Sequence, residues 1–309
     1  MKNLLEINNV VKNYGDFRAL NDVSIHIPKG SVYGLLGPNG AGKTSLIRII
    51  NQITMPDSGN IILDGEPLSP KHTAYIGYLP EERGLYKSMK VGEQALYLAQ
   101  LKGLSKSEAK KRLQYWFEKF DISAWWGKKI EELSKGMAQK VQFIVTVMHN
   151  PKLLIFDEPF SGFDPINAQL IAKEILQLRD EGATIIFSTH RMESVEEMCD
   201  EIALIHKSNK ILDGKLSDIK RQFRTNTFQV GLHTDYPKEV EAKLKEIFEV
   251  FPADFKLLGN ELTLNVKLNQ NNSANELLSF LTSRGQVQHF VELIPSANDI
   301  FIQAVNKNN

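Results

Sequence analysis

The chain has 309 residues, of which 42% are hydrophobic and 24% are charged, so it can bury a sizeable core and is not a disordered tail. Lysine plus arginine and aspartate plus glutamate both total 37, and this balance argues against a dedicated nucleic-acid-binding protein. The single cysteine, Cys199, excludes an intrachain disulfide framework and a cysteine-rich metal site.

The N-terminal segment, residues 1–6, contains charged residues and lacks the apolar core of a signal peptide. Nowhere does the sequence contain about eighteen consecutive apolar residues, the length that a membrane-spanning helix requires. We therefore expect a soluble, cytoplasmic chain that reaches a membrane only through a partner.

The first two thirds of the sequence predict an α/β fold. Leu5–Val10 and Val23–Ile27 alternate as strands do, and the buried strand Ser31–Leu36 runs into a glycine-rich loop and the helix Thr44–Ile50. The later elements are strands Asn60–Leu63 and Tyr75–Leu79, helices over about residues 88–150, strand Leu153–Phe156, helix Ile166–Arg179, strand Thr184–Ser188, and a hairpin of Ile202–His206 with Lys210–Leu212. Strand–helix–strand order predicts a parallel sheet within a mixed fold.

The last third predicts a second, smaller α+β domain after a polar connector at Ser217–Arg224. Its expected elements are strand Phe228–Leu232, helix Glu239–Phe248, strands Phe255–Leu258 and Leu262–Val266, helix Ala274–Arg284 and strand Val287–Leu293. The order βαββαβ is that of a ferredoxin-like domain. We therefore expect domains at residues 1–222 and 223–309.

A glycine-rich loop stands between the third predicted strand and the first predicted helix. It reads Gly37-Pro38-Asn39-Gly40-Ala41-Gly42-Lys43-Thr44 and fits the pattern G-x-x-x-x-G-K-[ST]. The glycines let backbone N–H groups surround phosphate oxygens, and the helix start adds positive potential. Lys43 can reach the β- and γ-phosphates of ATP, and the Thr44 hydroxyl can bind Mg²⁺. The loop, with Ser45 after it, predicts a nucleotide site but leaves kinases, GTPases and ATPases open.

Two adjacent carboxylates, Asp157 and Glu158, end the apolar strand Leu153–Phe156. Acids at the end of a buried strand are costly unless an ion or a polarised water pairs with them. We therefore expect Asp157 to hold Mg²⁺ and Glu158 to contact the water that attacks the γ-phosphate.

The pentapeptide Leu133-Ser134-Lys135-Gly136-Met137 follows the helical insertion and precedes the acidic strand. In this position it resembles the LSGGQ signature of the ABC ATPase family, from which Lys135 and Met137 depart. Tyr14 stands where that family stacks an aromatic ring on adenine. Residues 161–164, ending in Asp164, resemble the D-loop, and His190 follows a strand as the family's γ-phosphate histidine does. The resemblance covers residues 4–220.

The resemblance implies the ATP-hydrolysing subunit of an ABC transporter, with Glu158 and His190 as catalytic residues. It implies that Tyr14 and residues 37–45 bind ATP with Mg²⁺, and that the chain works as a head-to-tail homodimer. Four residues of one copy are then expected to complete the site of the other: Ser134, Lys135, Gly136 and Asp164.

Glu81 is a departure from the family, which usually has a glutamine at this position, next to the Mg²⁺ shell. A carboxylate can still bind the metal shell, but it adds negative charge near the γ-phosphate, which Arg83 would offset. The resemblance thus implies Glu81 as a further metal ligand; the alternative is an exposed acidic turn.

A separate integral membrane permease is the implied partner, with the chain held by it at the inner face of the cell membrane. Export is favoured because the C-terminal domain resembles accessory domains of exporter ATPases. The insertion at about residues 88–150 and the Glu81 loop are the expected contact surface. The alternative is a non-transport ABC ATPase acting on nucleic acid or the ribosome, which typically carries two ATPase domains or basic extensions. A nucleotide kinase or GTPase is opposed by the signature, Asp164 and His190 together.

Overall fold

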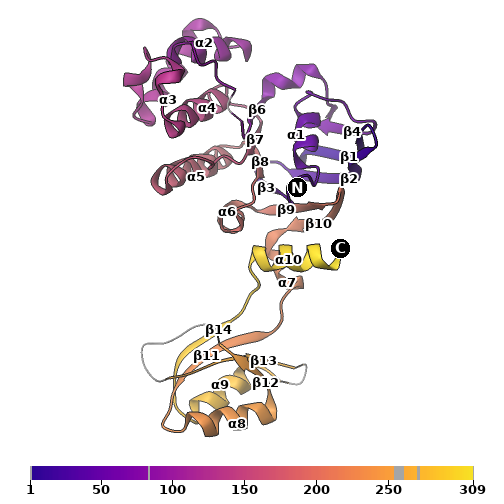
Figure 1. Ribbon diagram of the computed structural model, residues 1–309, viewed down its shortest axis with the longest axis vertical. Helices are drawn as coiled ribbons and strands as arrows, with labels where there is room; N and C mark the ends of the chain where they lie inside the picture. The colour runs from indigo at the N-terminus through magenta and orange to yellow at the C-terminus, as the bar shows by residue number, and fades with distance from the viewer. Residues whose placement is uncertain (1, 83, 254–260, 270–271, 309) are drawn as a thin grey trace. The chain divides into compact units, whose positions relative to one another are not determined.

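The computed structural model describes residues 2–82, 84–253, 261–269 and 272–308. It divides into two compact units, one formed by Met1–Leu216 with Ala304–Asn309 and the other by Ser217–Gln303. Figure 1 labels most of the helices and strands of both units. Each unit is described by itself below.

The centre of the first unit is a six-stranded sheet in the order β10-β9-β3-β8-β7-β6. Its strands are β3 (Val32–Leu36), β6 (Ile76–Leu79), β7 (Leu153–Asp157), β8 (Thr184–Ser188), β9 (Glu201–His206) and β10 (Asn209–Lys215). β10 pairs antiparallel with β9, and the other pairs are parallel. Every residue of β3, β7 and β8 is buried, which explains their continuous apolar sequences.

A second, antiparallel sheet has the order β2-β1-β4-β5. Its strands are β1 (Asn3–Tyr14), β2 (Phe17–Pro28), β4 (Ser58–Leu63) and β5 (Glu66–Pro67). Helix α1 (Lys43–Ile50) buries Ile47 and Ile50 in a core shared with residues of both sheets, such as Ile25 and Ile155. Burying each such side chain contributes roughly 1.5–3 kcal/mol, so the glycine-rich loop before α1 is anchored at its helical end.

The helical insertion contains α2 (Val91–Leu101), α3 (Lys106–Lys119) and α4 (Lys135–Val147), with 3₁₀ turns at Ser123–Trp125 and Ile130–Glu132. Phe143 of α4 packs its ring against Trp116 and Phe120 of the α3 end and against Phe156 of β7. This aromatic core joins the insertion to the strand that ends in Asp157. Helices α5 (Pro165–Asp180) and α6 (Met192–Met198) follow β7 and β8.

The second unit contains β11 (Thr227–His233), α8 (Pro237–Ile247), β12 (Glu249–Pro252), β13 (Leu262–Lys267), α9 (Ala274–Thr282) and β14 (Gln286–Glu292). The sheet order β12-β13-β11-β14, antiparallel throughout, is consistent with a ferredoxin-like domain. Its core joins Val240 and Leu244 of α8 and Leu277 of α9 to the strands, and Figure 1 shows both helices on one face of the sheet. The strand expected at Phe255–Leu258 lies outside the described residues.

Two helices differ from the sequence prediction. The expected polar connector is largely helix α7 (Leu216–Gln222), because Leu216 and Ile219 are buried three residues apart on one helical face. Helix α10 (Ala297–Lys307) was not predicted at all. It begins at a reciprocal cap, in which the Asp299 N–H donates to Ser296 Oγ at 3.1 Å and the Ser296 N–H to the Asp299 carboxylate at 3.0 Å.

None of the helices in the described part of the chain is both long enough and apolar enough to cross a membrane.

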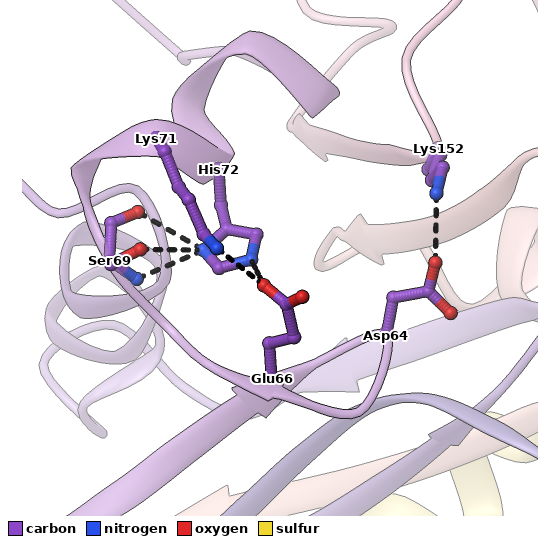
Figure 2. Close-up of polar contacts among 6 residues, drawn as sticks. All are labelled: Asp64, Glu66, Ser69, Lys71, His72 and Lys152. Carbon is purple, nitrogen blue, oxygen red and sulfur yellow. Dashed lines mark hydrogen bonds and ion pairs between the residues drawn. The ribbon is translucent and has the colours of Figure 1, made fainter.

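Charged side chains gather at the amino ends of β6 and β7, and we call Asp64, Glu66, Lys71, His72 and Lys152 the amino-end cluster (Figure 2). Lys152 Nζ lies 2.8 Å from Asp64, and Lys71 Nζ lies 2.6 Å from Glu66. The buried His72 points Nε2 toward Glu66 at 3.6 Å. These five side chains line one cavity of about 230 Å³.

Candidate active site

The glycine-rich loop between β3 and α1 has a backbone that only glycine can supply at two positions. Gly37 has φ +148°, and a Cβ there would lie 2.2 Å from the Ile205 carbonyl oxygen. Gly42 has φ +117°, and a Cβ there would lie 2.3 Å from the Ala19 carbonyl oxygen. These close approaches to β9 and β2 hold both ends of the loop, which is the rigid cradle that phosphate binding requires.

Helix α1 starts at Lys43, so the N–H groups of Lys43, Thr44 and Ser45 lie in its first turn and have no carbonyl partner within the helix. The Lys43 ammonium donates to the carbonyls of Gly37 at 2.7 Å and Pro38 at 3.1 Å, so it lies over the loop. Burial lowers the pKa of Lys43, while the charges of nearby carboxylates oppose this shift. The loop thus gathers N–H groups and one ammonium where a phosphate chain would fit.

Asp157, the last residue of β7, is 7% exposed. Burial raises the pKa of its carboxyl, and the charges of Glu81 and Glu158 raise it further, while the Ser188 hydroxyl and, to a smaller extent, the charge of Lys43 oppose this shift. In the described part of the chain no group of three or more His, Cys, Asp or Glu side chains could hold a metal ion. Mg²⁺ in nucleotide sites usually takes one or two protein ligands, with phosphates and waters as the others, so a buried carboxylate short of positive charge fits this ion.

Glu158 follows directly and is held by three donors from the end of β8. Its carboxylate accepts from the His190 backbone N–H at 2.8 Å, from Thr189 Oγ1 at 3.2 Å, and lies 2.7 Å from His190 Nδ1. A carboxylate only accepts, so Nδ1 carries the proton and Nε2 faces away from Glu158. The Glu158 side chain is 13% exposed and that of His190 is 76% exposed. His190 can therefore hold Glu158 in a fixed orientation, as a base at the edge of the sheet.

The backbone of Glu158 has φ +51°, a left-handed conformation that costs a residue with a side chain about 1 kcal/mol or more. The Glu158 N–H donates to the Ser188 carbonyl at 2.9 Å, and this contact with β8 fixes the turn. Thr189 was missed at the sequence level. The available signal was a small hydroxyl residue between the apolar strand β8 and His190.

The charge of Glu81 acts on the pKa values of both Lys43 and Asp157. The loop that carries it touches α4, whose Gln142 Nε2 lies 3.5 Å from the Glu82 carbonyl oxygen. Arg83, which was expected to offset the Glu81 charge, lies outside the described residues. The charges of Glu81, Asp157 and Glu158 therefore all act on Lys43, and we call Lys43, Glu81, Asp157 and Glu158 the carboxyl-end cluster.

Tyr14 ends β1 and is 44% exposed. The Lys12 ammonium lies 5.5 Å from the centre of its ring and also pairs with Asp57 at 2.8 Å. Stacking of Tyr14 on the base stays a prediction.

The pentapeptide and the loop 161–164 form two neighbouring helix starts. Ser134 caps α4 by accepting from the Met137 N–H at 3.3 Å, and Asp164 caps α5 by accepting from the Asn167 N–H at 2.9 Å. The backbone hydrogen bond from Asn167 lowers the pKa of Asp164. Ser134, Lys135 and Asp164 are exposed, and Gly136 is half-buried. These residues are accessible to a second molecule.

Comparison with known proteins matches residues 20–161 to the family model described as ABC transporter. Residues 214–305 match the C-terminal domain of the DrrA1-3-like ATP-binding proteins. The Bacillus subtilis protein named uncharacterized ABC transporter ATP-binding protein YhaQ is 41% identical over 98% of this chain and 98% of its own. The linearmycin resistance ATP-binding protein LnrL of the same organism is 36% identical over 70% of each chain. A solved structure described as an ATP-binding subunit of an ABC transporter has a TM-score of 0.67 at 32% identity, covering 71% of this chain and 93% of its own.

Proposed function

We propose that this chain, which belongs to the ABC transporter family of ATP-binding subunits, works with Mg²⁺ as the motor of an exporter by docking on a separate membrane permease. ATP binding and hydrolysis are the activity of the family. The expected fold class, a mixed α/β ATPase with a helical insertion, is confirmed. The division of roles among residues, the metal and the partners are our proposals.

The loop 37–45 binds the triphosphate through its N–H groups and Lys43. Thr44 and Asp157, with Glu81 beside them, are the residues that would hold Mg²⁺, which when bound neutralises charge on the β- and γ-phosphates. Tyr14 stacks on the adenine.

Glu158 orients the attacking water and accepts its proton as the oxygen bonds to the γ-phosphorus, while the bond to the β–γ bridging oxygen breaks. His190 holds the Glu158 carboxylate and faces the γ-phosphate with Nε2. The hydrogen bond between His190 Nδ1 and Glu158, at 2.7 Å, is the observation that carries this assignment.

Glu158→Gln tests this assignment, because it removes the base while keeping the shape of the side chain. Phosphate release should fall by about 10²- to 10⁴-fold, the usual contribution of a positioned base, with ATP affinity kept. Glu193→Gln, an exposed residue of α6, is the matched control and should hydrolyse normally. Near-normal turnover of Glu158→Gln would show that another group activates the water.

A homodimer would complete the site, with the helix starts at Ser134 and Asp164 of one copy covering the ATP of the other. Their exposure supports this arrangement, since neither side chain is buried within its own chain. Cross-linking of single cysteines at Ser134 and Asn39 should join two copies in the presence of ATP with the Glu158→Gln change. Cross-links that form equally without ATP would contradict an ATP-dependent dimer.

A cavity of about 320 Å³ beside the Glu81–Glu82 loop is the surface we assign to the permease. The apolar part of its lining includes Leu98, Leu101 and Val145 from α2 and α4. Leu101 is 65% exposed, and exposed apolar side chains around a cavity favour a protein contact. The chain would thereby sit at the inner face of the cell membrane.

Purification of the tagged chain from detergent-solubilised membranes should yield an integral membrane protein, and Leu101→Asp should weaken its recovery. The linearmycin resistance relative and the DrrA1-3-like domain support export rather than import. Recovery of ribosomal or DNA-repair proteins, with no membrane protein, would favour a non-transport ATPase. The neutral net charge speaks against direct nucleic-acid binding.

A further inference from the structure

Lys135 occupies the third position of the signature, where the family pattern has glycine, and its side chain lies against the loop before α5. A Cβ built on Gly162 would lie 2.4 Å from Lys135 Cε, 2.8 Å from Cδ and 3.1 Å from Cγ. The methylene stem of Lys135 therefore passes directly over the Gly162 Cα. Gly162 also has φ +86°, a left-handed conformation that favours glycine there.

The contact joins the starts of two helices that carry residues of the proposed dimer site. Lys135 is the first residue of α4, directly after its cap Ser134, and Gly162 stands two residues before Asp164, the cap of α5. Gly136 lies beside the same loop, because a Cβ there would lie 3.7 Å from the Gly162 carbonyl oxygen. A lysine at this position thus covers a surface that a glycine would leave open.

The ammonium of Lys135 makes no ion pair or hydrogen bond with the part of the chain that the structure describes. Lysine commonly packs its methylene stem on a surface while its charged end stays in water. The observed contact is therefore made by the stem and not by the charge.

We propose that Lys135 is a positioning residue, whose stem holds Gly162 so that Ser134 and Asp164 face the nucleotide of the second copy as one unit. This inference rests on the proposed dimer. A shift of about 1 Å in a group that positions substrate can cost roughly 10²-fold in rate, so a small packing contact has a measurable effect.

Three variants test the proposal. Lys135→Ala removes the stem without weakening α4, because alanine favours helices at least as well as lysine. It should lower kcat by about 10- to 100-fold and leave the KM for ATP within about threefold, since the loop 37–45 is untouched. Lys135→Met keeps a flexible apolar stem without the charge and should hydrolyse ATP within about threefold of the wild type. Lys110→Ala, an exposed lysine of α3, is the control and should match the wild type.

Hydrogen exchange on the full chain without nucleotide gives a readout that does not depend on the dimer. Backbone amides of residues 161–164 should exchange faster in Lys135→Ala than in the wild type or Lys135→Met. Normal turnover of Lys135→Ala, unchanged exchange, or equal losses in Lys135→Ala and Lys135→Met would overturn the proposal. If the ATP-dependent cross-link between positions 134 and 39 forms while Lys135→Ala is normal, only this inference fails; if that cross-link forms equally without ATP, the proposed dimer fails instead.

Discussion

Strand β7 has charged side chains beyond both of its ends, and the pKa values of the carboxyl groups shift in opposite directions at the two ends. In the amino-end cluster, hydrogen bonds from Lys152 and Lys29 lower the pKa of Asp64 to about 2, and Lys71 lowers that of Glu66. In the carboxyl-end cluster, burial raises the pKa of Asp157, and two further carboxylates stand near a single lysine.

The difference separates charges that stabilise the fold from charges that act on a ligand. At the amino end each acid has a lysine partner, so the ionised pairs favour the folded state. At the carboxyl end the acids exceed the cations, so ionisation of Asp157 destabilises the folded state. A bound cation would offset this destabilisation. Perturbed groups of this second kind are typical of functional sites.

The largest effect should come from Lys43→Ala, which removes the only lysine of the carboxyl-end cluster. Loss of a charge that stabilises the phosphates should lower the rate of ATP hydrolysis by roughly 10²- to 10³-fold. Phosphate release and calorimetric titration with ATP would measure rate and affinity separately.

Lys152→Ala is the matched control, since it removes one lysine from the opposite end of β7. It should leave hydrolysis unchanged. Equal losses in both variants would contradict the separation of roles.

Asp157→Asn should lower Mg²⁺-dependent hydrolysis less than Lys43→Ala does, because an amide oxygen can still bind the metal. It should also raise the free energy of unfolding by about 1 kcal/mol at pH 7 without nucleotide, because it removes a buried charge. The pKa of Asp157 is raised in the folded state, so protonation favours folding. The advantage of the variant should therefore be present at pH 7 and shrink as the pH falls toward the ordinary aspartate pKa of 3.8. Urea unfolding at several pH values measures this. A destabilised variant at pH 7 would show that the carboxylate is well paired.

Asp64→Asn should have the smallest effect, a loss of about 0.5–1 kcal/mol of unfolding free energy at pH 7, because its ion pairs face solvent. The folded-state pKa is lowered to about 2, so this stability is present above 3.8 and is lost as the pH falls through 2. Thermal unfolding at pH 7 and pH 3 should show the difference shrinking, with hydrolysis unaffected.

Glu66→Gln serves as the comparison within the same cluster. The Glu66 side chain is 58% exposed, so the melting temperature of the Glu66→Gln variant should stay within about 1 °C of the wild type. A larger shift for Glu66→Gln than for Asp64→Asn would reverse the order of the two ion pairs.

Much of the first unit could be predicted because its signals are local. The glycines before Lys43 and the acids after an apolar strand specify both their own backbone and their chemistry. The meeting of Glu158 with His190 follows from the pairing of β7 with β8, which strand–helix–strand order suggests.

Other features depend on contacts between distant segments, which no local sequence pattern predicts. The stem of Lys135 meets Gly162, and Asp64 meets Lys152, only after the chain has folded. Helix α10 did carry a local signal, the cap formed by Ser296 and Asp299, but the polar residues after it obscured the apolar spacing.

The position of β3 in its sheet has a consequence for synthesis of the protein. β3 leads into the phosphate loop, yet its neighbours β8 and β9 are translated about 150 and about 170 residues later. Strands with such distant partners pair slowly, since a long loop must close before any contact forms. On the ribosome the nucleotide loop therefore stays without its flanking strands until residues 184–206 have emerged. ATP can then report that β3 has gained both of its neighbouring strands, because only a chain with β8 and β9 in place offers it a formed cradle.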